Sequence, residues 1–437
     1  MKIVLIEPRA TQANVYSKMH MPLIGPILLG TILKNRGHQV EIYNEEIYTP
    51  DYSTIDADLV GVSILTSTAN RGYEIARKFP KEKVIMGGVH ASLMPDEALK
   101  YCRQVVAGEA EEVIVDVAEG RRKEPVVAGV AVQDLDTIPF PDFSLIKGLY
   151  IPSMVMPIST SRGCPFDCSF CSVTKMFGRK YRFRSAENVM AELDTVVGKV
   201  RQFFFCDDNF TANTRRARRL LNIMRKQHIG RWSCQVRCDA ARHPDMLNLM
   251  YKAGCRVVCV GLESINHKTL KAYQKNQTVE DIVQAVDSFH EKGLQIHGMF
   301  VLGGDDDDAG TVKETERFAR KHGIDSLQMM ILTPLPGTRT YDDLDKQKRI
   351  FSKDWDLYDG QHVVFHPKLL SALELQRAVF RAYAGFYALY RSIEMFLRLK
   401  FRNALVIVMG HGIVKEWQAY NRGMSWLPEQ KVCCPQK

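Results

Sequence analysis

The 437-residue sequence has no apolar run long enough to cross a membrane. The longest such run near the C-terminus, residues 404–409, is far shorter than the roughly 20 residues of a spanning helix. The N-terminal apolar stretch is too short, and reaches an acidic residue too soon, for a secretory signal peptide. We therefore expect a cytoplasmic protein whose eleven cysteines are reduced rather than paired.

The sequence also has no internal repeat, no low-complexity tract and no nucleic-acid-binding motif. Its formal net charge is +9, and much of the excess lies late in the chain, between residues 377 and 402. Without a motif beside it, this charge does not predict a nucleic-acid partner. The length exceeds that of a single domain, so we expect two or three.

Three cysteines, Cys164, Cys168 and Cys171, lie at spacings of four and three residues. Closely spaced thiolates suit a zinc ion or an iron–sulfur cluster. A structural zinc site needs four ligands, and no further Cys or His follows at zinc-finger spacing. A four-iron cluster held by three cysteines keeps one iron open for a substrate. The spacing also fits three core residues on one helical face, but Gly163 and Pro165 disfavour a helix interior here.

The motif, with the aromatic Phe170 just before its last cysteine, resembles that of the radical S-adenosylmethionine (SAM) superfamily. The resemblance implies a 4Fe-4S cluster whose open iron chelates the amino and carboxylate groups of SAM. It also implies that one electron from the cluster splits a carbon–sulfur bond of SAM. An electron donor such as flavodoxin or ferredoxin is then an expected partner.

Short apolar runs alternate with helical stretches through residues 146–345, which predicts strand–helix units. Six such units without a second dinucleotide-binding fingerprint indicate a partial (βα)6 barrel of the TIM type, with its site at the carboxyl ends of the strands. The expected strands are residues 158–161, 202–206, 232–236, 257–262, 296–302 and 327–332.

Residues at these strand ends suit the parts of SAM. Asp207 and Asp208 could accept hydrogen bonds from an ammonium group, and Arg237 could hold a carboxylate. Glu263 could bind a ribose hydroxyl pair, and glycines on the fifth strand leave room for adenine. Each has an ordinary alternative as a cap or turn, but in this order they resemble the radical SAM core. The expected SAM-binding residues are Phe170, Asp207, Asp208, Arg237, Glu263, Gly298, Gly303 and Pro334.

Residues 1–145 show the same alternation, with expected strands at 2–6, 39–43, 59–65, 83–86 and 105–107. This pattern predicts a Rossmann-like, doubly wound parallel sheet. Ligands of such sheets bind at the carboxyl ends of the strands, where glycines allow close approach of the backbone. The residues expected at these ends are Ser63, Thr66, Gly87, Gly88, His90, Gly108 and Glu109.

This segment resembles the cobalamin-binding domain of one radical SAM branch, on Pro22-Leu23, the Gly87–Ala91 stretch and the Gly108–Glu111 stretch. The resemblance implies that the seven residues contact cobalamin. The Asp-x-His-x-x-Gly motif that supplies a cobalt-ligating histidine in many such domains is absent. Either the corrin binds with no protein histidine on cobalt, or the domain has lost its corrin. The glycines could also be turns of a plain Rossmann-like scaffold.

Residues 346–437 are expected to form a helical domain. Residues 373–401 carry apolar and aromatic residues at helical spacing, and a second helix is expected at 403–417. Such helices would cover the open barrel. Their basic, aromatic character also suits a membrane surface or a lipid-like substrate. Cys433 and Cys434 are expected in a disordered tail.

Together these features predict an α/β protein with a cobalamin-binding-like domain, a radical SAM core and a C-terminal helical domain. The resemblance is to the branch that contains hopanoid methylases and the anaerobic magnesium-protoporphyrin monomethyl ester cyclase. It implies a cobalamin-dependent methyltransferase acting on an unactivated carbon of a small-molecule or lipid-like substrate. The alternatives are an oxidoreductase or cyclase using the same 5′-deoxyadenosyl radical, and a corrinoid or iron–sulfur sensor without turnover. The substrate is not identified by the sequence.

Overall fold

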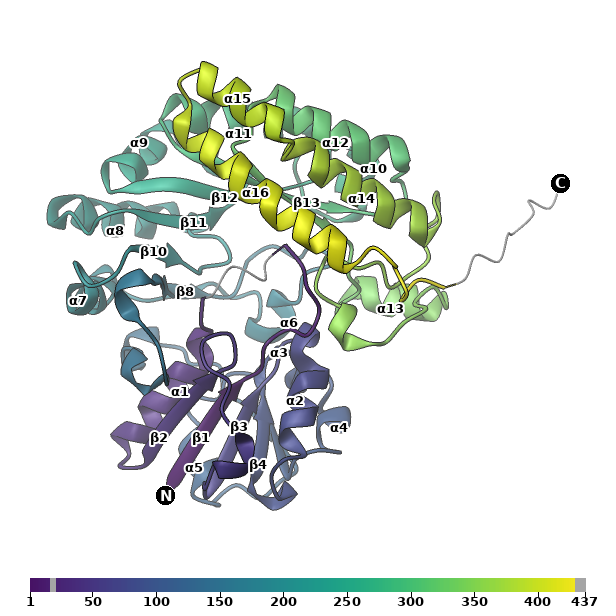
Figure 1. Ribbon diagram of the computed structural model, residues 1–437. Coiled ribbons are helices and arrows are strands. Elements are labelled where there is room, and N and C mark those ends of the chain that lie inside the picture. Colours follow the sequence, from purple (N-terminus) through teal and green to yellow (C-terminus); the bar gives the residue numbers. More distant parts are fainter. Residues whose placement is uncertain (16–20, 429–437) are drawn as a thin grey trace.

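A computed structural model describes residues 1–15 and 21–428 and shows two parallel sheets with helices around them (Figure 1). The N-terminal sheet lies at the bottom of this view, the second sheet lies above it, and the C-terminal helices form the top. Cys433 and Cys434 lie outside the described residues. None of the described helices is long and apolar enough to cross a membrane.

The N-terminal sheet has the strand order β2-β1-β3-β4-β5-β6, and all neighbours are parallel. The doubly wound sheet predicted from the sequence is thus confirmed, with one additional short edge strand, β6. The strands are β1 (Lys2–Glu7), β2 (Gln39–Asn44), β3 (Leu59–Ser63), β4 (Val84–Gly87), β5 (Gln104–Ala107) and β6 (Val126–Ala128).

Alternate side chains of β1 explain why helices cover both faces of this sheet. Ile3 and Leu5 belong to one hydrophobic core, whereas Val4 and Ile6 belong to another on the opposite face. Continuous apolar strands of this kind are buried on both sides. The helices of this domain are α1 (Ile24–Asn35), α2 (Ala69–Ala76), α3 (Gly88–Leu93), α4 (Pro95–Ala98) and α5 (Ile114–Ala118).

The second sheet has the order β14-β13-β12-β11-β10-β7 and is parallel throughout, as expected for a partial (βα)6 barrel. Its first strand was predicted at residues 158–161 but lies at Val155–Ile158. Ile158 is the last paired residue of this strand, opposite Phe205, and the chain then turns away from the sheet. The strands are β7 (Val155–Ile158), β10 (Gln202–Phe205), β11 (Trp232–Val236), β12 (Cys255–Glu263), β13 (Gln295–Leu302) and β14 (Ser326–Ile331).

Helices between these strands begin at well-formed N-caps. Thr278 and Asp281 form a reciprocal capping box at the start of α11, as their spacing predicts. The helices are α6 (Val173–Phe177), α7 (Ala186–Val196), α8 (Thr214–Gln227), α9 (Pro244–Lys252), α10 (His267–Ala272), α11 (Val279–Glu291), α12 (Ala309–Lys321) and α13 (Arg339–Lys346). Two short antiparallel strands, β8 (Ser161–Arg162) and β9 (Arg182–Phe183), flank α6.

The C-terminal segment contains three helices, α14 (Ala372–Phe386), α15 (Leu389–Leu397) and α16 (Phe401–Tyr420). The single helix expected over residues 373–401 is therefore wrong. The helix breaks at Ala388, whose backbone is extended. The neighbouring Tyr387 is held at β14, because its hydroxyl accepts from the Leu327 N–H and donates to the Leu327 carbonyl (3.0 Å each). The Tyr383 hydroxyl accepts from Met329 N–H at 2.8 Å, so α14 covers β14 as predicted.

Candidate functional site

The three motif cysteines lie in a loop between β8 and α6, and contacts that involve no cysteine hold this loop in place. The Arg339 guanidinium pairs with Asp167 (2.9 Å). The rings of Phe170 and Tyr273 meet edge to face at 5.1 Å between centroids. The cluster loop, residues 164–171, is thus fixed by residues far along the chain.

Cys164, Cys168 and Cys171 are half-buried free thiols. Burial raises the pKa of Cys164, and it raises that of Cys171 to about 12. In the described part of the chain, no group of three His, Cys, Asp or Glu residues could hold a metal ion together. Cysteines of a four-iron cluster bind different irons, so their sulfurs need not meet at one point. Three free thiols in one loop therefore fit the cluster better than zinc.

Beside this loop, Arg237 and Glu263 lie at the carboxyl ends of β11 and β12 with a buried lysine between them. Lys275 Nζ is 2.5 Å from Glu263 Oε1, and Arg237 donates to the Lys275 carbonyl. The Arg237 guanidinium also lies 3.7 Å from the Phe166 ring centroid, within the cluster loop. The structure thus places Arg237 against the loop and links Glu263 to Arg237 through Lys275. Sequence reasoning missed Lys275, because a lysine between two helices is usually exposed.

The structure separates the two neighbouring aspartates that follow β10. Asp207 is buried and accepts hydrogen bonds from the N–H groups of Thr160 (2.7 Å) and Ser161 (3.0 Å), so it holds the turn after β7. Asp208 instead lines a cavity, and burial, together with Asp207, raises its pKa to about 7. Of the pair, only Asp208 is placed to meet a ligand.

The remaining expected SAM residues are accounted for by packing. A Cβ atom on Gly298 would lie 3.1 Å from Ile324 and Leu262 side-chain atoms, so these side chains fill the space beside this glycine. On Gly303, a Cβ would meet Leu375 at 2.6 Å, and its N–H donates to Asp307 (3.1 Å). Pro334 is buried in the loop after β14. The structure does not bring these three to the group around Arg237.

A cavity of about 380 Å³ lies between the two parallel sheets and is lined by both. One wall is the apolar, glycine-rich edge of the N-terminal sheet, and the other includes Cys206, Asp208 and, from α6, Phe177. Five of the seven residues expected to contact cobalamin line it: Ser63, Gly87, Gly88, Gly108 and Glu109. A backbone wall of this kind lets a broad ligand lie close to the sheet, which fits a corrin.

Thr66 and His90, the other two, do not line this cavity. His90 is fully buried, with Thr66 Oγ1 3.4 Å from its Nδ1 and the Trp355 ring 4.9 Å away between centroids. Burial lowers the pKa of His90 to about 4. No histidine in the described residues lines the cavity, in keeping with a corrin held without a protein imidazole on cobalt.

Glu109 joins the two domains. Its carboxylate pairs with Arg162 (2.7 Å) and also with Arg182, and both arginines lie on the barrel side of the cavity. Glu111 adds a second pair with Arg162 (2.5 Å). These arginines were not identified from the sequence, because ion pairs between residues 53 and 73 positions apart leave no local pattern.

Replacing Glu263 by Gln will weaken SAM binding by about ten- to a hundredfold and leave the iron content unchanged. The substitution removes a charge-assisted hydrogen bond of on the order of 1.5–3 kcal/mol. Anaerobic equilibrium dialysis of the reconstituted enzyme against SAM measures the affinity. Glu314→Gln, on an exposed position of α12, is the matched control.

An unchanged affinity would remove Glu263 from the SAM site. A second variant, Glu263→Gln with Lys275→Met, separates contact from positioning. If the affinity returns in this double variant, Glu263 acts only by neutralising the buried lysine beside it.

Comparison with known proteins matches the two halves of this site to two families. The model of the radical SAM superfamily matches residues 158–319, and the model of the B12-binding domain matches residues 13–118. The chain is 28% identical to the bacteriochlorophyllide d C-12(1)-methyltransferase of Chlorobaculum tepidum, over 88% of each chain. It is 26% identical to the anaerobic magnesium-protoporphyrin IX monomethyl ester cyclase of Rubrivivax gelatinosus, over 89% of this chain and 77% of the relative.

Solved structures share the architecture. The cobalamin-dependent radical enzyme OxsB, with aqua-cobalamin bound, superposes with a TM-score of 0.68 at 14% identity, over 98% of this chain and 82% of its own. The methyltransferase TsrM from Kitasatospora setae superposes with a TM-score of 0.63 at 19% identity, over 79% of this chain and 76% of its own. This likeness shows the fold, and the two family matches lie on the domains that form the cavity. The chain therefore carries a B12-binding domain followed by a radical SAM domain.

Proposed function

We propose that this enzyme is a cobalamin-dependent methyltransferase that acts on an unactivated carbon of an apolar small-molecule or lipid-like substrate. The observation that carries the proposal is the cavity of about 380 Å³ that both domains line. A substrate held there would lie between Asp208, an electrostatic neighbour of Cys164 and Cys171, and the glycine-rich edge of the N-terminal sheet. That placement suits a reaction in which one carbon is activated from one side and methylated from the other.

Different residues of the chain would bind the different cofactors of such a reaction. Cys164, Cys168 and Cys171 would hold the cluster, and Arg237 with Glu263 would orient SAM. The edge formed by Gly87, Gly88 and Gly108 would hold cobalamin. When bound, these groups supply a 5′-deoxyadenosyl radical and a transferable methyl group, while the protein orients the substrate and excludes water.

The relatives support methyl transfer and leave one alternative. The Chlorobaculum tepidum relative is named a methyltransferase, and a hopanoid C-2 methylase of Rhodopseudomonas palustris is 27% identical over 62% of this chain and 52% of the relative. The cyclase of Rubrivivax gelatinosus matches nearly the whole chain as well. Radical oxidation without methyl transfer is therefore the second candidate function.

One anaerobic assay separates these functions. The reconstituted enzyme is incubated with cobalamin, a reductant, SAM carrying a deuterated methyl group, and planar or lipid-like candidate substrates. We expect a product that carries the label, formed together with 5′-deoxyadenosine and S-adenosylhomocysteine. Substrate-dependent 5′-deoxyadenosine without label transfer would indicate the oxidoreductase, and neither product with any substrate would indicate a sensor.

Turnover by this route needs an electron for every SAM that is cleaved. We propose a flavodoxin- or ferredoxin-like donor, acting in the cytoplasm, as the partner that supplies it. Replacing the chemical reductant in the assay by such a donor tests this part of the proposal.

A further inference from the structure

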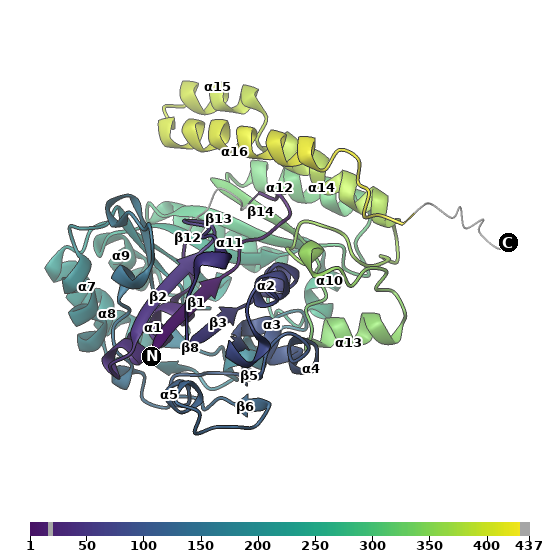
Figure 2. The same cartoon turned by 60° about the horizontal axis from the view of Figure 1, so that its bottom comes forward.

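The helices α15 and α16 form the outermost layer of the molecule in both views, and α15 packs against α16 (Figures 1 and 2). We call residues 389–420 the C-terminal hairpin. Residues 404–409 of α16 are apolar on both sides, because Ile407 is buried whereas Leu405, Val408 and Met409 are exposed. A helix that is apolar all round is normally covered on both faces, so one face of this hairpin has no cover.

Exposed apolar side chains gather on this hairpin. In the described part of the chain, ten of the nineteen exposed large apolar side chains lie between residues 389 and 409. Contiguous patches of this kind mark interaction sites, whereas single exposed residues do not. The ten are Leu389, Tyr390, Ile393, Phe396, Leu397, Leu399, Phe401, Leu405, Val408 and Met409.

The turn of the hairpin holds one of its two most exposed leucines in an unfavourable backbone conformation. Leu399 has φ of 58° and is 75% exposed. Glycine or asparagine is the usual residue in this left-handed position after a helix. A bulky apolar side chain that is kept in this conformation and faces solvent indicates a contact with another molecule.

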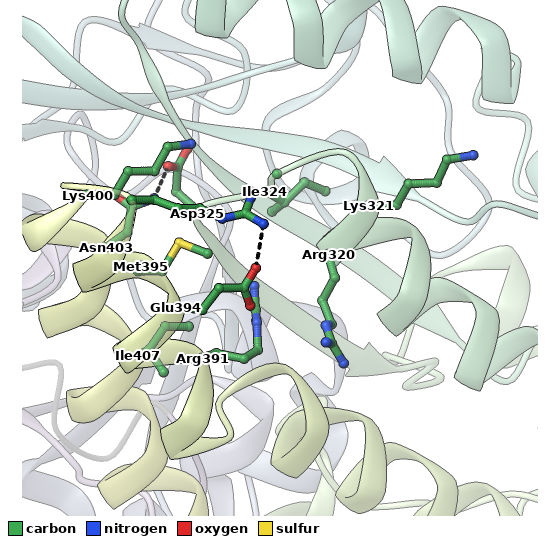
Figure 3. Close-up of a pocket in the computed structure, with 12 residues that line it drawn as sticks. Arg320, Lys321, Ile324, Asp325, Arg391, Glu394, Met395, Lys400, Asn403 and Ile407 are labelled. Carbon is green, nitrogen blue, oxygen red and sulfur yellow. Dashed lines mark hydrogen bonds and ion pairs between the residues drawn. The ribbon is translucent and has the colours of Figure 1, made fainter.

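A basic pocket of about 360 Å³ lies beside the turn of the hairpin, between the end of α12 and the hairpin itself (Figure 3). Its cationic lining residues are Arg320, Lys321, Arg391, Arg398 and Lys400. Figure 3 shows the guanidinium groups of Arg320 and Arg391 near one another, with Lys321 pointing away from them.

The two carboxylates in the pocket do not balance these cations. Asp325 already accepts from Ile296 N–H (2.8 Å) and from the Asn403 amide (2.6 Å), and Glu394 pairs with Arg398 (2.8 Å). Within the described residues, Lys321, Arg391 and Lys400 have no carboxylate within ion-pair distance. The pocket therefore has unneutralised positive charge and suits an anion such as a phosphate group.

We propose that the C-terminal hairpin docks the enzyme onto the surface of a bilayer that contains anionic lipids. The apolar turn, residues 396–401, would enter the headgroup boundary, and the basic pocket would receive a lipid phosphate. Exposed apolar residues flanked by lysine and arginine are typical of helices that lie on membranes. A second copy of the chain fits less well, because it would bring two basic surfaces together.

Co-sedimentation of the full-length protein with vesicles tests this proposal without turnover, so it can fail or succeed independently of the proposed function. We expect binding to phosphatidylcholine vesicles that contain phosphatidylglycerol, and weaker binding to phosphatidylcholine alone. The variant Phe396→Ser/Leu397→Ser/Leu399→Ser should reduce binding by more than about tenfold. Leu369→Ser, an exposed leucine outside the hairpin, is the matched control.

Two further variants keep the test decisive if the triple variant unfolds. Lys321→Gln/Lys400→Gln should lower affinity for anionic vesicles by about fivefold for each charge, with Lys226→Gln on α8 as control. Leu399→Asn should weaken binding while it raises the melting temperature, because asparagine suits the left-handed conformation.

The proposal is overturned if the wild-type protein sediments with neither kind of vesicle. It is also overturned if light scattering shows a dimer that the triple serine variant converts to monomer without any vesicle binding. That result would assign the apolar face to self-association instead.

Discussion

Replacing Cys164, Cys168 and Cys171 together by alanine will give a folded protein that holds no iron. The wild-type protein reconstituted under anaerobic conditions should hold about four irons per chain and show the absorption of a 4Fe-4S cluster. The variant should keep its fold because Arg339, Arg237 and Tyr273 hold the cluster loop through contacts that involve no cysteine sulfur. Cleavage of SAM should fall to zero, since no other three-cysteine loop exists in the described chain.

Iron analysis, visible absorption and the yield of 5′-deoxyadenosine measure this outcome. Cys259→Ser is the matched control, because Cys259 is also a half-buried free thiol but lies on β12 away from the loop. Four irons retained in the triple alanine variant would show that the cluster ligands lie elsewhere.

Replacing Gly87 by leucine will abolish cobalamin binding and leave cluster assembly and SAM cleavage intact. Gly87 lines the cavity, and a Cβ atom there would meet only the Val106 carbonyl oxygen, at 3.6 Å. The added side chain therefore fits the sheet but enters the space proposed for the corrin. Visible spectra of desalted protein after incubation with cobalamin measure the loss, which should be complete.

Gly88 is a poorer choice for this experiment. It has φ of 88°, and a Cβ atom would lie 2.6 Å from the Ile64 carbonyl oxygen, so its substitution would distort the loop itself. Gly412→Leu on α16, where a Cβ atom would meet no other atom within 4 Å, is the matched control. Normal cobalamin binding by the Gly87 variant would place the corrin away from this edge.

Electron paramagnetic resonance of the bound cob(II)alamin completes this test. Since no histidine in the described residues lines the cavity, no coupling to a protein nitrogen is expected. Such a coupling would contradict a corrin bound without an imidazole on cobalt.

The strands could be predicted because each is a short apolar run, buried on both faces and bounded by turn residues. β11 was predicted at its observed ends, and β1 to β5 to within two residues. The cysteine motif was equally easy to recognise, because all three cysteines lie within eight residues. Features of this kind depend on residues close together in the sequence, so one sequence is enough to predict them.

The direction in which a residue faces was harder to predict. His90 follows paired glycines at a strand end, as a ligand contact would, yet Trp355 covers it from a distant part of the chain. Gly298 was expected to make room for adenine but instead makes room for Ile324. Glu109 lines the cavity as expected, and its pairing with Arg182 depends on how the two domains meet. These outcomes are set by tertiary contacts that one sequence does not display.

The contact between Trp355 and the N-terminal domain has a consequence for how the protein is made. Trp355, Tyr358 and Val364 belong to the core on one face of the N-terminal sheet, together with Val62 and Tyr73. The Trp355 indole also donates to Glu97 on α4 (2.7 Å). At about 5–20 residues per second, the ribosome needs on the order of 10–50 s to pass from β5 to this tryptophan. During synthesis, part of the apolar face of the first domain therefore remains exposed to solvent until the barrel has been made. The cavity edge that α3 helps to form is therefore completed only after most of the chain has been synthesised.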